Sequence, residues 1–91
     1  MEHDEARDRM RKALDLVHTW PAVYMFKFIF EPDEERLNAV LALFPAEAKV
    51  LRKYSKAGKY LSITVNEVMM SADEVVARYD KAAQIEGVIV L

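Results

Sequence analysis

The amino-acid sequence predicts a single α+β sandwich in which helices cover one face of an antiparallel sheet. Apolar residues alternate with a period of two at residues 23–30 and 59–66, as they do in strands. At residues 33–44 and 71–84 they recur every three or four positions, as they do in amphipathic helices. The chain has 91 residues, of which 53% are hydrophobic and 31% charged, and no Cys. That composition is sufficient for one core without disulfide bonds.

Residues 3–18 form the first predicted element, an amphipathic helix that ends before Trp20-Pro21, because a residue before proline disfavours the helical conformation. Its apolar stripe is narrow, and a helix of this length is marginal alone in water. We therefore expect it to dock within its own chain or dimer. We interpret residues 1–19 as an N-terminal helix and residues 20–91 as the folded domain. The stripe consists of Ala6, Met10, Ala13, Leu14 and Val17.

Residues 23–30 are predicted to be a central strand, because both of its alternating faces are mostly apolar. Lys27 marks the more hydrated of the two faces. Glu31-Pro32-Asp33 then ends the strand and begins a helix, whose acidic first residues suit its positive end. One strand face carries Tyr24, Phe26, Phe28 and Phe30, and the other carries Val23, Met25, Lys27 and Ile29.

Residues 48–56 and 59–66 predict a hairpin about Gly58, which can supply the positive φ that the turn requires. In a capping box, Ser71 and Glu74 each bond the other's free backbone amide, which predicts the start of a helix that runs to about Gln84. Val88-Ile89-Val90-Leu91 is typical of a fully buried last strand.

The order of elements after the first helix is β-α-β-β-α-β. Right-handed crossovers then give a ferredoxin-like sandwich, with two helices on one face of a four-stranded antiparallel sheet. Residues 48–56 become an edge strand, and their cations suit an edge. The other sheet face carries Met25, Ile29 and Tyr60 beside Lys27, and is too apolar to be left bare. We expect the helix at 3–18 or a second subunit to cover it.

Three stretches, at residues 54–65, 71–79 and 85–88, together with Trp20-Pro21 before the first strand, resemble the YbeD-like family of small bacterial proteins of unassigned function. The resemblance extends over residues 18–91. It implies a ferredoxin-like fold related in shape to the ACT domains that sense small molecules, and it implies no catalytic residues. The chain differs from the family in its longer charged N-terminal helix. It also has Glu31-Pro32 where a glycine is common, which argues against a standard amino-acid site.

The residues contain no pattern for catalysis, a metal or a cofactor. His3 and His18 are far apart in sequence and fit surface positions, and the acidic residues at helix starts are explained by capping. A glycine-rich phosphate loop is excluded, because the chain has only two glycines, Gly58 and Gly87. No apolar run is long enough to span a membrane, and the charged start is unlike a secretory signal. We expect a cytoplasmic protein that is not an enzyme.

Positive charge is concentrated in the hairpin, where residues 48–66 hold five cations and no acid although the whole chain has a net charge of −2. Edge protection explains this pattern structurally. A docking patch for an anion, an acidic partner or nucleic acid explains it functionally, and its side chains should then share one surface. The candidate binding residues are Lys27, Arg52, Lys53, Lys56, Lys59 and Tyr60.

These observations predict a non-catalytic regulatory or adaptor module that binds a small anionic ligand, a protein partner or a second copy in a homodimer. The alternative is an RNA-binding domain that uses the hairpin at 48–66. RNA-recognition motifs of this topology need stacked aromatics on the open face. Here Tyr60 fills one such position, whereas Ser62 and Lys27 occupy others. Nucleic acid is therefore the less favoured partner.

Overall fold

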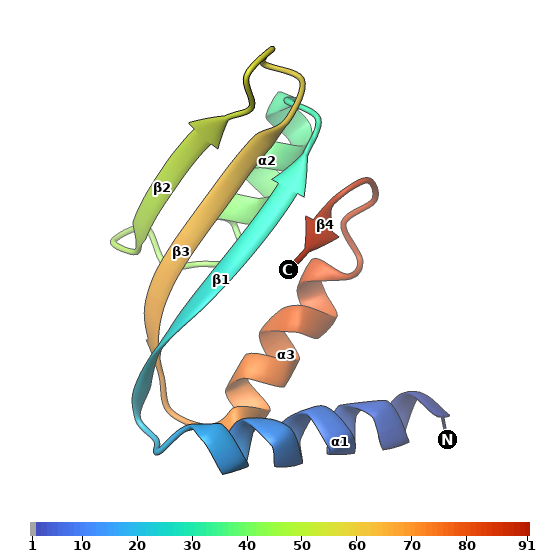
Figure 1. The fold of residues 1–91 in the computed structure, drawn as a ribbon, viewed down its shortest axis with the longest axis vertical. Coiled ribbons are helices and arrows are strands. Elements are labelled where there is room, and N and C mark those ends of the chain that lie inside the picture. The colour runs from blue at the N-terminus through green and yellow to red at the C-terminus, as the bar shows by residue number, and fades with distance from the viewer. Residues whose placement is uncertain (1) are drawn as a thin grey trace.

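The computed structural model describes residues 2–91, with side chains from residue 5 onward, so the expected surface position of the His3 side chain lies outside the described part. The described residues form three helices and four strands, in the order α1-β1-α2-β2-β3-α3-β4 (Figure 1). Their bounds are α1 Glu2–Val17, β1 Ala22–Phe30, α2 Glu34–Leu41, β2 Lys49–Tyr54, β3 Leu61–Met69, α3 Ala72–Ala82 and β4 Ile89–Val90.

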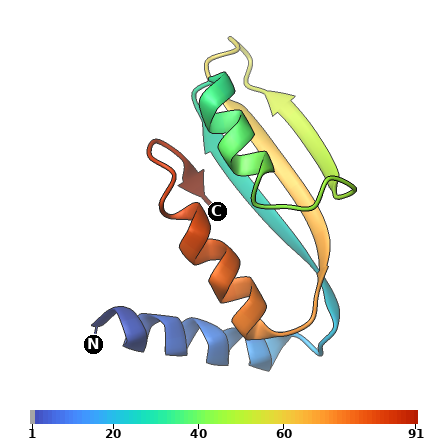
Figure 2. The same cartoon turned by 180° about the vertical axis from the view of Figure 1, so that it is seen from behind.

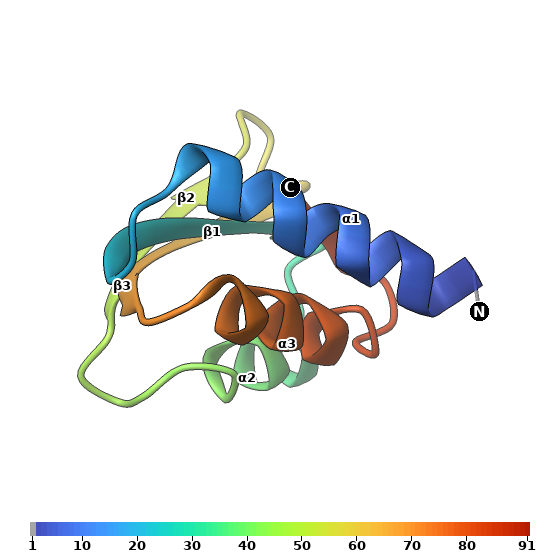
Figure 3. The same cartoon turned by 90° about the horizontal axis from the view of Figure 1, so that it is seen from below.

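The four strands form one antiparallel sheet in the order β2-β3-β1-β4. The two long central strands pair over their whole length, from Ala22 opposite Met69 to Phe30 opposite Leu61. Helices α2 and α3 lie together on one side of this sheet (Figures 2 and 3). The α+β architecture is therefore confirmed, and the strand order is consistent with the predicted ferredoxin-like sandwich.

The core lies between the central strands and these two helices. Phe26, Phe28 and Phe30 of β1 are buried, as are the residues opposite them on β3. Phe44, which follows α2, lies with its ring centroid 5.4 Å from that of Phe26 and 5.8 Å from that of Phe28. The predicted inward face of β1 is confirmed. The opposing β3 residues are Leu61, Ile63 and Val65.

Arg78 of α3 closes one side of this aromatic cluster. Its guanidinium lies 4.7 Å from the centroid of the Phe44 ring and donates a 2.6 Å hydrogen bond to the carboxylate of Glu67 on β3. The side chains of both charged partners are mostly buried. The pair therefore links α3 to the sheet above the phenylalanines, and its charges are matched within the fold.

Side chains cap the two later helices. The Asp33 carboxylate accepts a hydrogen bond from the Glu35 amide, and the Ser71 hydroxyl accepts one from the Glu74 amide. The second half of the predicted capping box is wrong, because the Glu74 carboxylate accepts from the amide of Met70 and not from that of Ser71. The carboxylate still satisfies a backbone donor immediately before the helix.

The last strand departs from its prediction. β4 contains only Ile89 and Val90, which pair with Ile29 and Phe28 at the outer side of β1. The sequence predicts full burial of this strand, yet Ile89 and Leu91 are exposed. An edge strand on a sheet with one covered face can bury only alternate residues, so the apolar run at 88–91 does not imply full burial.

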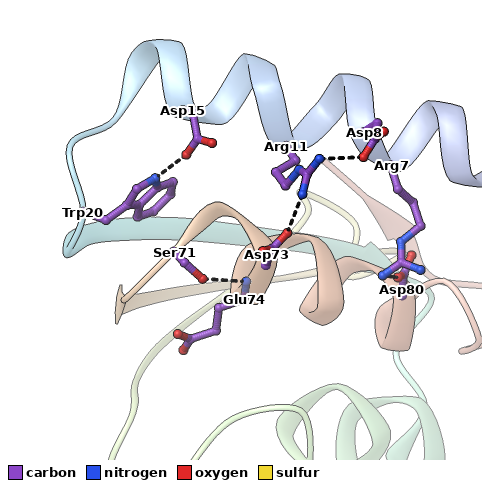
Figure 4. Close-up of polar contacts among 9 residues, drawn as sticks. All are labelled: Arg7, Asp8, Arg11, Asp15, Trp20, Ser71, Asp73, Glu74 and Asp80. Atoms are coloured by element: carbon purple, nitrogen blue, oxygen red, sulfur yellow. Dashed lines mark hydrogen bonds and ion pairs between the residues drawn. The ribbon is translucent and has the colours of Figure 1, made fainter.

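Helix α1 crosses the end of the sandwich and packs on α3 (Figures 1 and 4). Leu14 reaches the core. The guanidinium of Arg7 lies 2.9 Å from the carboxylate of Asp80, and that of Arg11 lies 3.7 Å from the carboxylate of Asp73. The predicted docking of α1 within its own chain is confirmed. Because it docks on α3, the expectation that it covers the other sheet face is wrong.

Truncation of Phe26 to Ala should lower the free energy of unfolding by about 3–5 kcal/mol, because it leaves a cavity in the aromatic core. The matched change Met25→Ala, one residue earlier on the opposite face, should cost less than about 1 kcal/mol. Urea denaturation of both variants measures the difference. Equal losses would show that the two faces of β1 are assigned incorrectly.

The docking of α1 predicts unequal effects at two leucines two residues apart. Leu14→Ala should lower the free energy of unfolding by about 2 kcal/mol because Leu14 is buried. Leu16→Ala should change it by no more than about 0.5 kcal/mol, since Leu16 is 89% exposed. Chemical denaturation tests both. A negligible effect of Leu14→Ala would mean that α1 does not pack on the domain in solution.

Candidate functional site

The sheet face opposite α2 and α3, here called the open face, is covered by no described element of the chain (Figure 1). Alternation places on it the side chains of β1 and β3 that do not enter the core. On β1 these are Val23, Met25, Lys27 and Ile29, and their partners on β3 are Val68, Asn66, Thr64 and Ser62.

Large apolar side chains of the open face are exposed on all four strands. Met25 of β1 is 58% exposed and Leu51 of β2 is 62% exposed. Val23 and Val68 lie opposite each other on the central strands, and both are more than half exposed. Ile89 extends the apolar surface onto β4. Several exposed apolar side chains on one face of a sheet are a feature of interaction surfaces, which makes the open face a candidate interaction site.

The charged side chains that the strands place on the open face are all positive. Lys27 lies on β1, and Lys49 and Lys53 lie on β2 on either side of Leu51. None of the strand positions that face this side carries Asp or Glu. No ion pair of these lysines is found among the residues that the structure describes. The open face therefore combines apolar contact area with unneutralised positive charge.

The predicted site residues are only partly brought together. Lys27 and Lys53 share the open face, whereas Arg52 alternates to the other side of β2, opposite the buried Ile63. The expectation that the hairpin cations share one surface is therefore wrong for Arg52. Arg52 lines a hollow on that side of the sheet, together with Phe44 and Val50. For Arg52, edge protection is sufficient to explain the charge.

The remaining candidates surround the hairpin turn. Gly58 has a φ of +71°, as predicted for the turn. Lys56 and Lys59 flank it and are exposed, and the Lys59 ammonium lies 5.5 Å from the centroid of the Tyr60 ring. The backbone amide of Tyr60 donates a 2.9 Å hydrogen bond to the Ser55 hydroxyl. These contacts fix the position of Tyr60 at one end of the open face.

A hollow of about 280 Å³, here called the anchor hollow, lies between the hairpin and the open face. It exists because Ser62, a short side chain on β3, is flanked by the longer Ile29 on β1 and Lys53 on β2. The Ser62 hydroxyl donates a 3.4 Å hydrogen bond to the Lys53 carbonyl. The anchor hollow is lined by Ile29, Lys53, Tyr54, Ser55, Tyr60 and Ser62.

Sequence reasoning missed Leu51, Val68 and Ile89 as parts of this surface. Leu51 could not be placed because Val50 beside it is equally apolar, so period alone did not define the facing of β2. The pairing of Tyr54 with Leu61 next to the turn fixes the register of the hairpin and hence the facing of Leu51. The facing of β2 follows once the turn is known to span residues 55–60, between the paired Tyr54 and Leu61.

The strongest perturbation of a titratable group lies away from the open face. Burial and a 2.9 Å hydrogen bond to the Tyr24 hydroxyl raise the pKa of Tyr79 far above its ordinary value. The phenol is therefore held neutral, as suits a bond between β1 and α3. Among the described residues, no three His, Asp or Glu side chains gather as metal ligands.

One family profile matches the chain, that of a protein family of unknown function (DUF493), over residues 15–91. The chain belongs to this family. The match includes the whole sheet, α2 and α3, and only the last residues of α1. No curated protein and no solved structure gives a significant match. No helix in the described part of the chain has the length and apolar character needed to cross a membrane.

The facing of β2 predicts opposite outcomes for two adjacent substitutions. Val50→Asp should lower the free energy of unfolding by more than about 2 kcal/mol, because Val50 packs against the core and a carboxylate there would be desolvated. Leu51→Asp should change it by less than about 0.5 kcal/mol because Leu51 faces solvent. Urea denaturation measures both. The reverse order would place Arg52 on the open face and remove Lys53 from it.

Proposed function

We propose that this protein is a non-catalytic adaptor or regulatory module that binds an acidic protein partner on the open face of its sheet. The observation that carries the proposal is the combination of exposed apolar side chains with Lys27, Lys49 and Lys53, while no described strand position that faces this side is acidic. Apolar area supplies affinity, and matched charge supplies selectivity and a fast encounter.

The fold supports a role in binding. A ferredoxin-like sandwich, the finer interpretation of this α+β fold, buries one face of its sheet under two helices and leaves the other face accessible. The resemblance to YbeD-like proteins, and in shape to ACT domains, favours regulation by binding over turnover. Arg78 and Glu67 near the core neutralise each other's charge in an ion pair, so we assign them a role in the fold and not in binding.

RNA is the principal alternative occupant, and the open face fits it less well. Base stacking needs aromatic side chains on the central strands. The corresponding positions here carry Met25 and Lys27 on β1, and Ser62 and Thr64 on β3. Tyr60 lies at one end of this surface and could stack only one base. An acidic polypeptide uses both the apolar and the cationic parts of the face, so it is the favoured partner.

A titration of the isotope-labelled protein with poly-L-glutamate tests the proposal. Amide chemical shifts should change along β1, β3 and the open side of β2, and the apparent affinity should fall as salt rises. Lys27→Ala combined with Lys53→Ala should weaken binding about three- to ten-fold, since each charge contributes up to about 1 kcal/mol.

The matched control removes the same charge elsewhere, by Lys12→Ala with Lys81→Ala on the exposed surfaces of α1 and α3. Binding to the control should equal that of the unmodified protein. Equal weakening in the two double variants would refute a site on the open face. A stronger response of the same amides to poly(U) RNA would favour the RNA alternative.

A further inference from the structure

Lys27 lies near the middle of the open face. Met25 and Ile29 flank it on β1, Thr64 faces it on β3, and the backbone amide of Leu91 donates a 2.9 Å hydrogen bond to its carbonyl. Its side chain is already partly buried among these neighbours, whereas Met25 and Leu91 beside it are exposed. No ion pair of its ammonium group is found among the described residues, so water solvates this group while the face is uncovered.

Any occupant that covers Met25 and Ile29 removes that solvent from Lys27. A desolvated ammonium without a counter-charge is strongly unfavourable, so the occupant must place a carboxylate against it. A second copy stacked face to face would bring further lysines and no side-chain carboxylate, because the same face carries Lys49 and Lys53 and none of its strand positions is acidic. This charge pattern selects an acidic partner over self-association through the open face.

The anchor hollow indicates a second property of the occupant, in addition to its carboxylates. The Ser55 hydroxyl already accepts the Tyr60 amide, and the Ser62 hydroxyl already donates to the Lys53 carbonyl. What is left to contact an occupant is apolar surface, contributed by Ile29, the tyrosine rings and the side chain of Lys53. At about 280 Å³ it is smaller than a typical site for a whole small-molecule ligand, and its size suits one large side chain.

We infer that the open face recognises an acidic segment of a partner protein in which one aromatic or leucine side chain enters the anchor hollow while flanking carboxylates pair with Lys53 and Lys27. The inference rests on the proposed function and specifies its partner. The register gives the spacing: Lys53 and Lys27 are two strands apart and two residues apart along the sheet, so their Cα atoms are separated by about 12 Å. The two carboxylates must therefore be spaced widely enough to reach both ammonium groups.

Binding of two matched peptides tests the inference. The first has about ten residues, with one phenylalanine at the centre of a run of glutamates, and the second has alanine in place of the phenylalanine. The phenylalanine peptide should bind the protein at least about ten-fold more tightly, because a buried aromatic anchor dominates the affinity of such contacts. Isothermal titration calorimetry measures both affinities.

Two variants locate the anchor. Ser62→Leu fills the anchor hollow and should reduce the affinity for the phenylalanine peptide to that for the alanine peptide, which should itself be unchanged. Tyr60→Ser removes one wall of the hollow from an exposed position and should act in the same direction without loss of stability. Equal affinities of the two peptides for the unmodified protein would overturn the inference. If poly-L-glutamate still bound the open face, the proposed function would stand.

Sedimentation velocity tests whether the charges of the open face prevent it from binding a second copy of the chain. The unmodified protein should sediment as a species that Met25→Asp does not alter, whereas Lys27→Met should produce concentration-dependent self-association, because the change replaces the charge at the centre of the open face with an apolar side chain. A dimer of the unmodified protein that Met25→Asp dissociates would overturn the inference. So would a Lys27→Met variant that associates no more than the unmodified protein.

Discussion

The pairing of β1 with β3 is the constraint on which the rest of the structure depends. Its register places Phe26 and Phe28 on the same side as Ile63 and Val65, and this surface requires helices above it. The same register necessarily places Met25, Lys27 and Ile29 on the opposite side. Because side chains alternate strictly along a strand, the core and the open face are two consequences of one arrangement.

Several contacts hold the covered side in place. Phe44 meets the phenylalanines of β1, and Arg78 stacks on Phe44 while its charge is matched by Glu67. Helix α1 adds Leu14 at one end and leaves the open face free (Figure 1). The described fold thus uses its own ion pairs to join helices to each other and to the sheet. The lysines of the open face have no such role in it, which is why their charge is informative about a partner.

Much of this architecture could be predicted from local patterns. The period-two alternation of β1, the Ser71 cap and the positive φ of Gly58 each follow from one stretch of chain. The facing of β2 could not be predicted, because Val50 and Leu51 are both apolar. The exposure of β4 could not be predicted either, because it depends on the position of this strand at the edge of the sheet. The anchor hollow depends on a short Ser62 beside two longer neighbours on other strands, which no single segment reveals.

Occupation of the open face by an acidic segment with an apolar anchor can be observed directly. Intermolecular nuclear Overhauser effects between the protein and the bound phenylalanine peptide measure it. We expect contacts from the phenylalanine ring to the methyl groups of Ile29 and the ring of Tyr60, which line the anchor hollow. Contacts confined to α1, to the acidic start of α2 or to the side of β2 that carries Arg52 would contradict it.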